Sequence, residues 1–390
     1  MAVALSGGGD SLALALIAAD WAREAGRPLL ILTVDHRLQA QSAGWSAACA
    51  DTARRLGAAF RALAWTGAKP GTGLAAAARA ARHRLLAEAA RQAGARVILM
   101  GHTASDVAEA AAMRAAGSTT PAPREWAPSP AWPEGRGVFL LRPMLELARG
   151  EIRDWLAARG ERWIEDPANA DPGSARARAR AAGAPSVAPA PEPNLAALGE
   201  ACAVDAAGSL TLPREAIRSA TPEAARAFLG MAAVCAGGGD RRPATEALER
   251  IRQILGGPAA LASSLAGARI EADEATVSVF REPGEARRGG LPTLYLTPGK
   301  PVVWDGRFEL TAARPGLNVD RLEGLARRLP REQQAAVMAL PARARLALPA
   351  VLEGASVTCP AVAESGDVAC RGLVADRLLA ACGLVEREPF

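Results

Sequence analysis

The chain has 390 residues, of which 50% are hydrophobic and 22% charged, and its formal net charge is +5. This length provides for two or three domains, and the apolar fraction provides a sizeable core. The sequence has no run of 18 apolar residues, which argues against a membrane helix and a membrane partner. Its six cysteines are scattered without a C-x-x-C pair. This pattern argues against zinc or iron–sulfur chemistry, and we expect a reduced, cytoplasmic protein.

Predicted strands and helices alternate through the first 160 residues. Strands are expected over 2–5, 29–34, 59–64, 96–100 and 138–141, and helices over 11–25, 43–57, 71–94, 105–116 and 147–159. Repeated strand–helix units predict an α/β fold, a doubly wound parallel sheet with helices on both faces. Such sheets bind ligands at the carboxyl ends of their strands. We therefore expect Ser6, Asp35 and His102 to surround one site.

The remaining chain predicts an accessory region behind a linker. Residues 117–136 are rich in Pro, Ser and Gly and are expected to form a long irregular insert. A Pro/Ala-rich linker is predicted over 182–193, after a catalytic domain over 1–181. Residues 194–390 form the accessory region, mostly helical with a small α+β part. Helices are expected over 194–256 and short strands over 268–311.

A glycine-rich loop joins the first predicted strand to the first helix. Its sequence is Ser6-Gly7-Gly8-Gly9-Asp10-Ser11. Backbone N–H groups at a helix N-terminus attract phosphate, and glycines let a phosphate approach the backbone closely. A P-loop kinase would place a lysine in this loop, and there is none. The pattern SGG-x-DS instead resembles the loop of the ATP pyrophosphatases, which cut ATP between its α- and β-phosphates.

Further motifs follow in order along the chain. They are Asp35-His36, A-R-A-A-R-H over 78–83, G-H-T-A-S-D-V-A-E over 101–109, L-R-P-M-L over 141–145, and W-I-E-D-P-A-N-A-D over 163–171. Together with the glycine-rich loop, they resemble the tRNA(Ile)-lysidine synthase family of the PP-loop ATP pyrophosphatase superfamily. The resemblance covers about residues 1–181 and implies an adenine nucleotide alpha hydrolase-like sheet.

The resemblance implies a ligase that forms a carbon–nitrogen bond on tRNA. Enzymes of this family use ATP to adenylate O2 of the wobble cytidine in the CAU anticodon of tRNA(Ile). The amine of free L-lysine then displaces AMP from C2, and the products are lysidine, AMP and pyrophosphate. Magnesium neutralises the pyrophosphate of the ATP in this chemistry. A lysine ammonium needs carboxylates that hold it and accept its proton.

The resemblance also assigns roles to residues. ATP phosphates are expected at Ser6, Gly7, Gly8, Gly9, Asp10 and Ser11. Catalytic roles are expected for Asp10, Asp35, His36, His102, Asp106 and Glu109. The metal ligands are expected to be Asp10 and Asp106. Contacts to tRNA or to phosphates are expected from Arg79, Arg82, Arg114, Arg142, Arg176, Arg178 and Arg180.

Two departures from the family pattern keep other interpretations open. Ser105 stands where the family usually has Asp, and Ala177 stands where it usually has Asn. One alternative is a degenerate paralogue that binds tRNA or nucleotide without catalysis. Another is a different PP-loop tRNA-modifying enzyme, such as a thiolation enzyme. The Asp35-His36 pair could also have only the structural role of ending a strand. The arginines could form a solvated helix face or reflect the arginine-rich composition of the chain. The oligomeric state stays open, with a homodimer as one alternative.

Overall fold

The computed structural model describes residues 1–117, 122–165, 178, 193–285, 291 and 293–385. The chain divides into two compact units, Met1–Pro191 (unit 1) and Glu192–Phe390 (unit 2). This division falls within the range predicted as a linker. Residues 182–192 of that range lie outside the described residues.

Unit 1 is built on one six-stranded sheet. Its strands are β1 (Ala2–Ala4), β2 (Leu30–Asp35), β3 (Ala59–Ala64), β4 (Val97–Met100), β5 (Trp126–Pro128) and β6 (Phe139–Leu141). They lie in the order β3-β2-β1-β4-β6-β5, and all neighbouring pairs are parallel except β5 with β6. The helices are α1 (Gly9–Glu24), α2 (Ser42–Arg55), α3 (Leu74–Gln92), α4 (Ala104–Ala115) and α5 (Arg149–Ala158). The predicted doubly wound parallel sheet is therefore confirmed.

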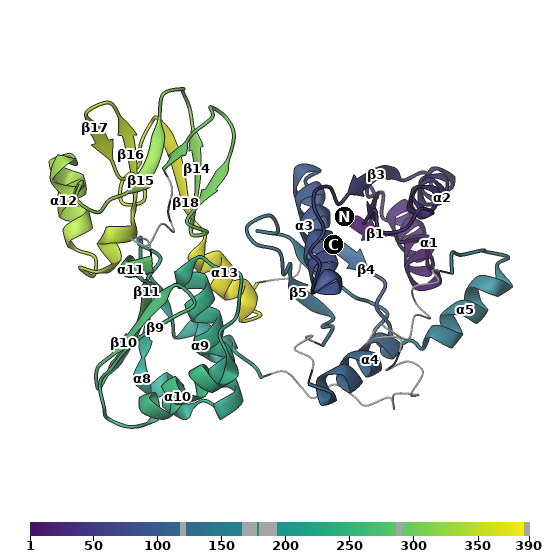
Figure 1. Cartoon of the computed structure of the whole chain (residues 1–390), viewed down its shortest axis with the longest axis horizontal. Helices are drawn as coiled ribbons and strands as arrows, with labels where there is room; N and C mark the ends of the chain where they lie inside the picture. The colour runs from purple at the N-terminus through teal and green to yellow at the C-terminus, as the bar shows by residue number, and fades with distance from the viewer. Residues whose placement is uncertain (118–121, 166–177, 179–192, 286–290, 292, 386–390) are drawn as a thin grey trace. The chain divides into compact units, whose positions relative to one another are not determined.

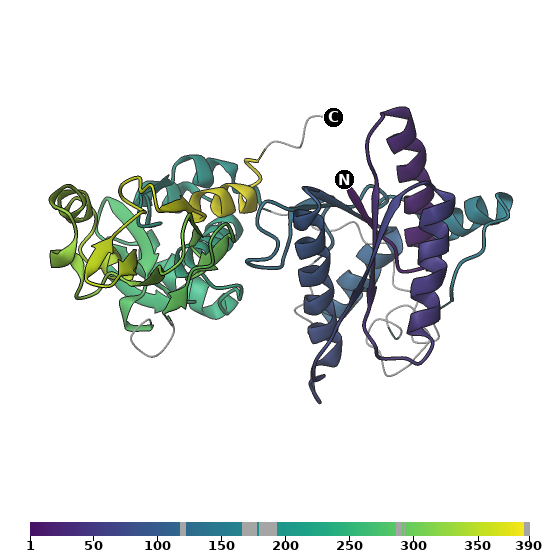
Figure 2. The same cartoon turned by 90° about the horizontal axis from the view of Figure 1, so that it is seen from above.

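The short apolar strands form the centre of the sheet because side chains on both of its faces are buried. Val3 packs with buried residues of α1, α2 and α5. Ala2, its neighbour in β1, packs with buried residues of α3. Successive strand residues point to opposite faces, so helices cover both. Figures 1 and 2 show α3 on one side of the sheet and α1 and α2 on the other.

The segment predicted as an irregular insert contains a strand. β5 pairs antiparallel with β6 at the edge of the sheet, in the register Trp126 to Leu141 and Pro128 to Phe139. The Trp126 ring stacks on Phe139 with centroids 4.9 Å apart. A proline is tolerated here because an edge strand needs hydrogen-bond partners on one side only. The expectation of a wholly irregular segment over 117–136 was wrong.

The described residues of unit 2 form three antiparallel sheets and several helices. One sheet has five strands: β7 (Ala203–Val204), β8 (Leu210–Pro213), β11 (Thr276–Arg281), β10 (Ala268–Ala272) and β9 (Leu261–Leu265). A second has four: β12 (Leu294–Tyr295), β15 (Asn318–Arg321), β16 (Pro349–Glu353) and β17 (Ser356–Thr358). The third has three: β13 (Val302–Trp304), β14 (Phe308–Ala312) and β18 (Val368–Gly372).

The helices of unit 2 concentrate near its beginning. They are α7 (Ala196–Glu200), α8 (Arg214–Ser219), α9 (Pro222–Gly237), α10 (Thr245–Gly256), α11 (Pro283–Glu285), α12 (Arg331–Met338) and α13 (Val374–Ala381), with 3-10 turns at Ala326–Arg328 and Ala344–Ala347. The predicted helices over 194–256 are present, with β7 and β8 between them. In the part of the chain that the structure describes, every helix is too short or too polar to cross a lipid bilayer.

Candidate active site

A cavity of about 510 Å³ lies at the carboxyl ends of β1, β2 and β4. Its walls include Ser6, Asp35 and His102, which follow or end those three strands. The sheet topology explains this convergence, because parallel strands all present their carboxyl ends at one edge. The cavity also takes in residues of α1, of α4 and of the segment just after α5.

The glycine-rich loop has the geometry of a phosphate cradle. Gly7 has a φ of +88°, a conformation that side chains disfavour. The Ser11 hydroxyl donates to the carbonyl of Gly8 at 2.9 Å and accepts from the backbone N–H of Ser6 at 3.2 Å. Helix α1 begins at Gly9, so the unsatisfied N–H groups of its first turn follow this loop. The loop is fixed by its own serines.

A segment distant in sequence packs over this loop. The backbone N–H of Ile164 donates to the carbonyl of Gly7 at 2.9 Å. A Cβ atom at Gly7 would lie 2.5 Å from Cδ1 of Ile164, and one at Gly9 would lie 3.4 Å from Trp163. Both contacting residues line the cavity. The packing of Ile164 therefore requires a glycine at position 7, whereas a Cβ at Gly9 would make only an ordinary van der Waals contact with Trp163.

Three predicted site residues converge on an arginine that sequence reasoning missed. Nε of Arg149 donates to Oδ2 of Asp10 at 2.9 Å, and Nη1 donates to Oε1 of Glu109 at 3.1 Å. Its Nη2 lies 3.5 Å from Oδ2 of Asp106. Burial lowers the pKa of Arg149, but these carboxylates outweigh it, and the pKa stands above its ordinary value. The cluster thus gathers three acidic side chains around one charged guanidinium.

Asp106 also caps the N-terminus of the helix that carries it. Its Oδ2 accepts from the backbone N–H of Thr103 at 2.9 Å and from the Thr103 hydroxyl at 3.1 Å. This reciprocal capping box satisfies N–H groups at the start of α4. Ser105, the departure from the family pattern, lies in the same first turn and is half-buried. The capping bonds fix Asp106 on the cavity wall.

Asp35, His36 and Arg82 form another side of the cavity. Asp35 accepts a hydrogen bond at 2.7 Å from the backbone N–H of Arg37. The ring of His36 lies edge-on to Trp65, with centroids 6.1 Å apart. Burial and then the charge of Arg82 lower the pKa of His36, so the ring is neutral at pH 7. Arg82 is half-buried, which argues against a purely solvated face.

His102 is oriented by a buried arginine. Nε of Arg142 donates to Nδ1 of His102 at 3.3 Å, and its Nη1 donates to the carbonyl of Arg124 at 2.6 Å. A neutral imidazole that accepts at Nδ1 carries its proton on Nε2. Burial and the charge of Arg79 lower the pKa of Arg142 to about 10, so it stays charged at pH 7. The neighbouring His83 is buried, and its pKa falls to about 2 through burial and nearby arginines.

Among the described residues, Arg79, Arg114 and Arg178 of the predicted set do not line this cavity. Arg114 is exposed at the end of α4, where its Nε donates to the carbonyl of Ala110 at 3.3 Å. Arg178 is exposed, and Arg176 and Arg180 lie outside the described residues. Arg79 is half-buried and is not among the residues that line the cavity.

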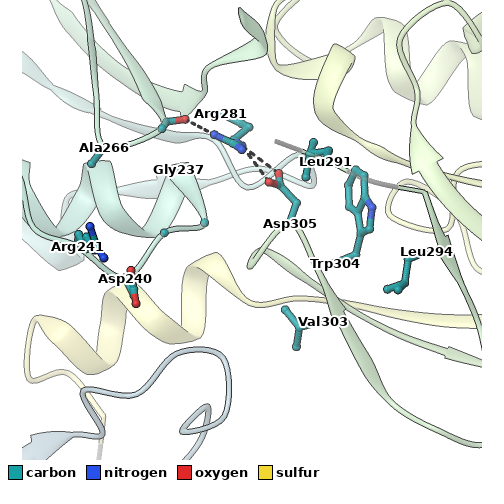
Figure 3. Close-up of a pocket in the computed structure, with 13 residues that line it drawn as sticks. Gly237, Asp240, Arg241, Ala266, Arg281, Leu291, Leu294, Val303, Trp304 and Asp305 are labelled. Carbon is teal, nitrogen blue, oxygen red and sulfur yellow. Dashed lines mark hydrogen bonds and ion pairs between the residues drawn. The ribbon is translucent and has the colours of Figure 1, made fainter. Parts of the chain in front are cut away.

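A second cavity, of about 580 Å³, lies within unit 2 and holds none of the predicted site residues. Its walls include the backbone of Gly237–Gly239 and the side chains of Arg281, Trp304 and Asp305 (Figure 3). Nε of Arg281 contacts both carboxylate oxygens of Asp305, at 3.0 and 3.2 Å. Asp305 also accepts from Nε of Arg307 at 2.7 Å. These buried ion pairs link β11 to the turn between β13 and β14.

Comparisons with known proteins agree with the geometry of unit 1. The family described as PP-loop domain matches residues 1–187. A tRNA(Ile)-lysidine synthase of Caulobacter vibrioides is 49% identical over 87% of this chain and 81% of its own length. One of Brucella melitensis biotype 2 is 37% identical over 78% of this chain and 72% of its own length.

Among solved structures, the U34-tRNA thiolase NcsA from Methanococcus maripaludis matches with a TM-score of 0.38 and 16% identity, over 46% of this chain and 64% of that one. A likeness at that level says nothing of function. The two synthases, together with the PP-loop match over unit 1, settle the family. The chain belongs to the tRNA(Ile)-lysidine synthase family of PP-loop enzymes.

Proposed function

We propose that the cavity of unit 1 is the active site at which this ligase joins L-lysine to the wobble cytidine of a CAU-anticodon tRNA(Ile). In the first step O2 of the cytosine attacks the α-phosphate of ATP, and pyrophosphate leaves. In the second step the lysine amine attacks C2, AMP leaves, and the amine loses a proton. The observation that carries the proposal is that Asp10 of the glycine-rich loop and Asp106 of α4 line one cavity and meet, together with Glu109, at the guanidinium of Arg149.

The phosphates of ATP are assigned to the loop Ser6–Ser11. The positive φ of Gly7 and the start of α1 at Gly9 support this assignment, because both turn backbone N–H groups toward an anion. Ser6 is exposed at the start of the loop, and its hydroxyl lies 3.1 Å from that of Ser11, which holds the two serines of the loop together. Donors fixed before the reaction stabilise the charge that develops on the leaving pyrophosphate.

The carboxylates of Asp10 and Asp106 fit a magnesium ion. Both lie close to the same guanidinium, so they can approach a common point. Mg²⁺ takes oxygen ligands and is usually held by one or two carboxylates together with substrate phosphates. Mg²⁺ bound here would neutralise the charge of the pyrophosphate. Asp10 belongs to the ATP loop, which places this pair where phosphates are proposed to bind.

The lysine amine is assigned to Asp106 and Glu109 on α4. His102, which precedes α4 in the chain, is assigned to the activated base. Both carboxylates are buried, and a buried acid pair attracts a cation more strongly than an exposed one. They can hold the ammonium and accept its proton. The Arg142 contact supports a fixed orientation for His102. Asp35 and His36 are assigned to the adenosine or to the cytosine.

The arginines are assigned to phosphates of ATP or tRNA. Arg82 lines the cavity and Arg142 lies behind His102. Arg79, Arg114, Arg176, Arg178 and Arg180 complete the set proposed to meet the tRNA. Contacts of this kind position a nucleic acid without reading its sequence. We propose that unit 2 also binds the tRNA. The enzyme is proposed to act in the cytoplasm, where its six free thiols stay reduced.

The direct test is the incorporation of labelled lysine into an unmodified tRNA(Ile) transcript with a CAU anticodon, with ATP and Mg²⁺. A methionine tRNA transcript, which carries the same anticodon, is the control. ATP-dependent labelling of the isoleucine transcript alone is the expected result. Binding of ATP and tRNA without labelling would instead favour the degenerate paralogue. Ser105→Asp would then be the first restoration to test.

A further inference from the structure

One arginine joins the two halves of the proposed site. Asp10 comes from the ATP loop, whereas Asp106 and Glu109 come from α4, and all three contact the guanidinium of Arg149. Each of its three nitrogens points to a different carboxylate, at 2.9, 3.1 and 3.5 Å. The guanidinium nitrogens of Arg149 are therefore directed at carboxylates of the protein itself.

The fold delivers this guanidinium to the acids. Arg149 is the first residue of α5, and the same helix buries Ile152 and Leu156 in the core shared with α1. The Arg149 side chain is 17% exposed, and that of Glu109 is 3% exposed. Like charges this close to one another and this far from water repel strongly. A resident cation is what keeps three such carboxylates together.

We propose that Arg149 is a positioning residue for lysine, which holds Asp106 and Glu109 together in the arrangement that receives the substrate ammonium. The proposal rests on the proposed function, in which those two acids bind the amine. Three carboxylates and one guanidinium leave two formal negative charges in the cluster. A cationic substrate is attracted to that excess. Without Arg149 the Glu109 carboxylate would turn away from Asp106, which its capping bonds keep in place, and the amine would lose its paired ligands.

Two substitutions distinguish the effect of the positive charge of Arg149 from the effect of its planar guanidinium geometry. Arg149→Met removes the charge but keeps an unbranched stem, and Arg149→Lys keeps the charge without the planar fork. Binding of labelled lysine is measured by equilibrium dialysis with a non-hydrolysable ATP analogue and Mg²⁺, in the absence of tRNA. Binding of the ATP analogue alone is measured by calorimetry. The KM for lysine and kcat are then measured with the CAU transcript.

We expect the lysine affinity of Arg149→Met to fall about 10- to 100-fold, by analogy with the loss of residues that orient the ligands of a metal ion. Arg149→Lys should recover part of that loss, and both variants should keep the wild-type affinity for the ATP analogue. The KM for lysine should rise more than kcat falls. Arg55→Gln is the matched control, because Arg55 forms a surface pair with Glu161 in the same unit. Its lysine affinity should stay at the wild-type value.

Two results would overturn the proposal. Lysine affinity that survives in folded Arg149→Met would remove the positioning role. A loss of ATP affinity, alone or with lysine affinity, would assign Arg149 to phosphates instead. If Arg149→Met does not fold, Arg149→Lys still tests the proposal through the same two affinities. Failure of the proposed function looks different, because the wild-type protein would then neither bind lysine nor transfer it to the transcript.

Discussion

Gly7 is the glycine of the Ser6–Ser11 loop that is least tolerant of a side chain. Its φ of +88° disfavours any L side chain, and a Cβ atom there would lie 2.5 Å from Ile164. We expect Gly7→Ala to lower the free energy of unfolding of unit 1 by about 1–3 kcal/mol, the usual cost of a strained backbone conformation. Urea denaturation measures the change.

Gly8→Ala is the control for this prediction. It lies in the same loop at a φ of −70°, and the nearest atom to its added Cβ would be 3.7 Å away. Gly8→Ala should therefore unfold close to the wild type. Equal losses in the two variants would contradict the assignment of strain to Gly7 alone.

Cys49 is the cysteine of unit 1, and its environment is wrong for a thiolation nucleophile. Its side chain is 1% exposed, and burial raises the pKa of its thiol above the usual value. The reactive form of cysteine is the thiolate, which this environment disfavours. We expect Cys49→Ala to keep ATP-dependent lysine incorporation, measured with the CAU transcript. A folded Cys49→Ala protein without activity would show that this thiol is needed for lysine incorporation.

At the scale of elements, the turn between β13 and β14 depends on one buried charge. Asp305 has a side chain 3% exposed and pairs with Arg281 and Arg307, which are 8% and 1% exposed. Asp305→Asn keeps the shape, and Asn tolerates the φ of +52° at this position. Since the substitution removes the carboxylate that pairs with two buried arginines, we expect a loss of about 3–5 kcal/mol in the free energy of unfolding.

A surface acid provides the matched control for this charge removal. Asp367 pairs with Arg314, and the two side chains are 53% and 39% exposed. Exposed pairs contribute about 0–1 kcal/mol, so Asp367→Asn should cost far less than Asp305→Asn in the same urea titration. Similar losses would show that the Asp305 pairs do not depend on burial.

The elements of unit 1 could be predicted because their periodicity is set by burial on both faces of the sheet. Apolar runs such as Val97–Met100 are fully buried, and each predicted helix lies within a few residues of its observed position. β5 could not be predicted, since three residues ending in proline carry no alternation. Its pairing comes from Trp126 stacking on Phe139, a contact made only in the folded chain.

The candidate site likewise contains residues that could be predicted from the sequence and residues that could not. Asp35 and His102 were predictable because they follow apolar strands, and parallel strands bring such positions to one edge. Arg149 was not, because it reads only as one more arginine at the start of a helix. Its role depends on the packing of α5 against α1, which no local pattern specifies. The helix-capping bonds of Asp106 were likewise not predicted, because the family resemblance assigned this residue to a metal.

At the scale of the whole molecule, the chain has two units with separate cores. The apolar clusters of residues 1–191 share no residue with those of residues 192–390. A chain of this kind does not have a single free energy of unfolding. The effects of Gly7→Ala and Asp305→Asn must therefore be assigned to different transitions.

Calorimetry of the full-length protein tests this division together with the location of the ATP site. We expect two unfolding transitions, of which Gly7→Ala lowers one and Asp305→Asn the other. Mg²⁺ and a non-hydrolysable ATP analogue at 100 times its Kd should stabilise the Gly7-sensitive transition by about 2.7 kcal/mol, because the ligand binds only folded unit 1. The Asp305-sensitive transition should not move. A shift of that second transition by the analogue would place ATP in unit 2, and one transition sensitive to both substitutions would show that the units unfold together.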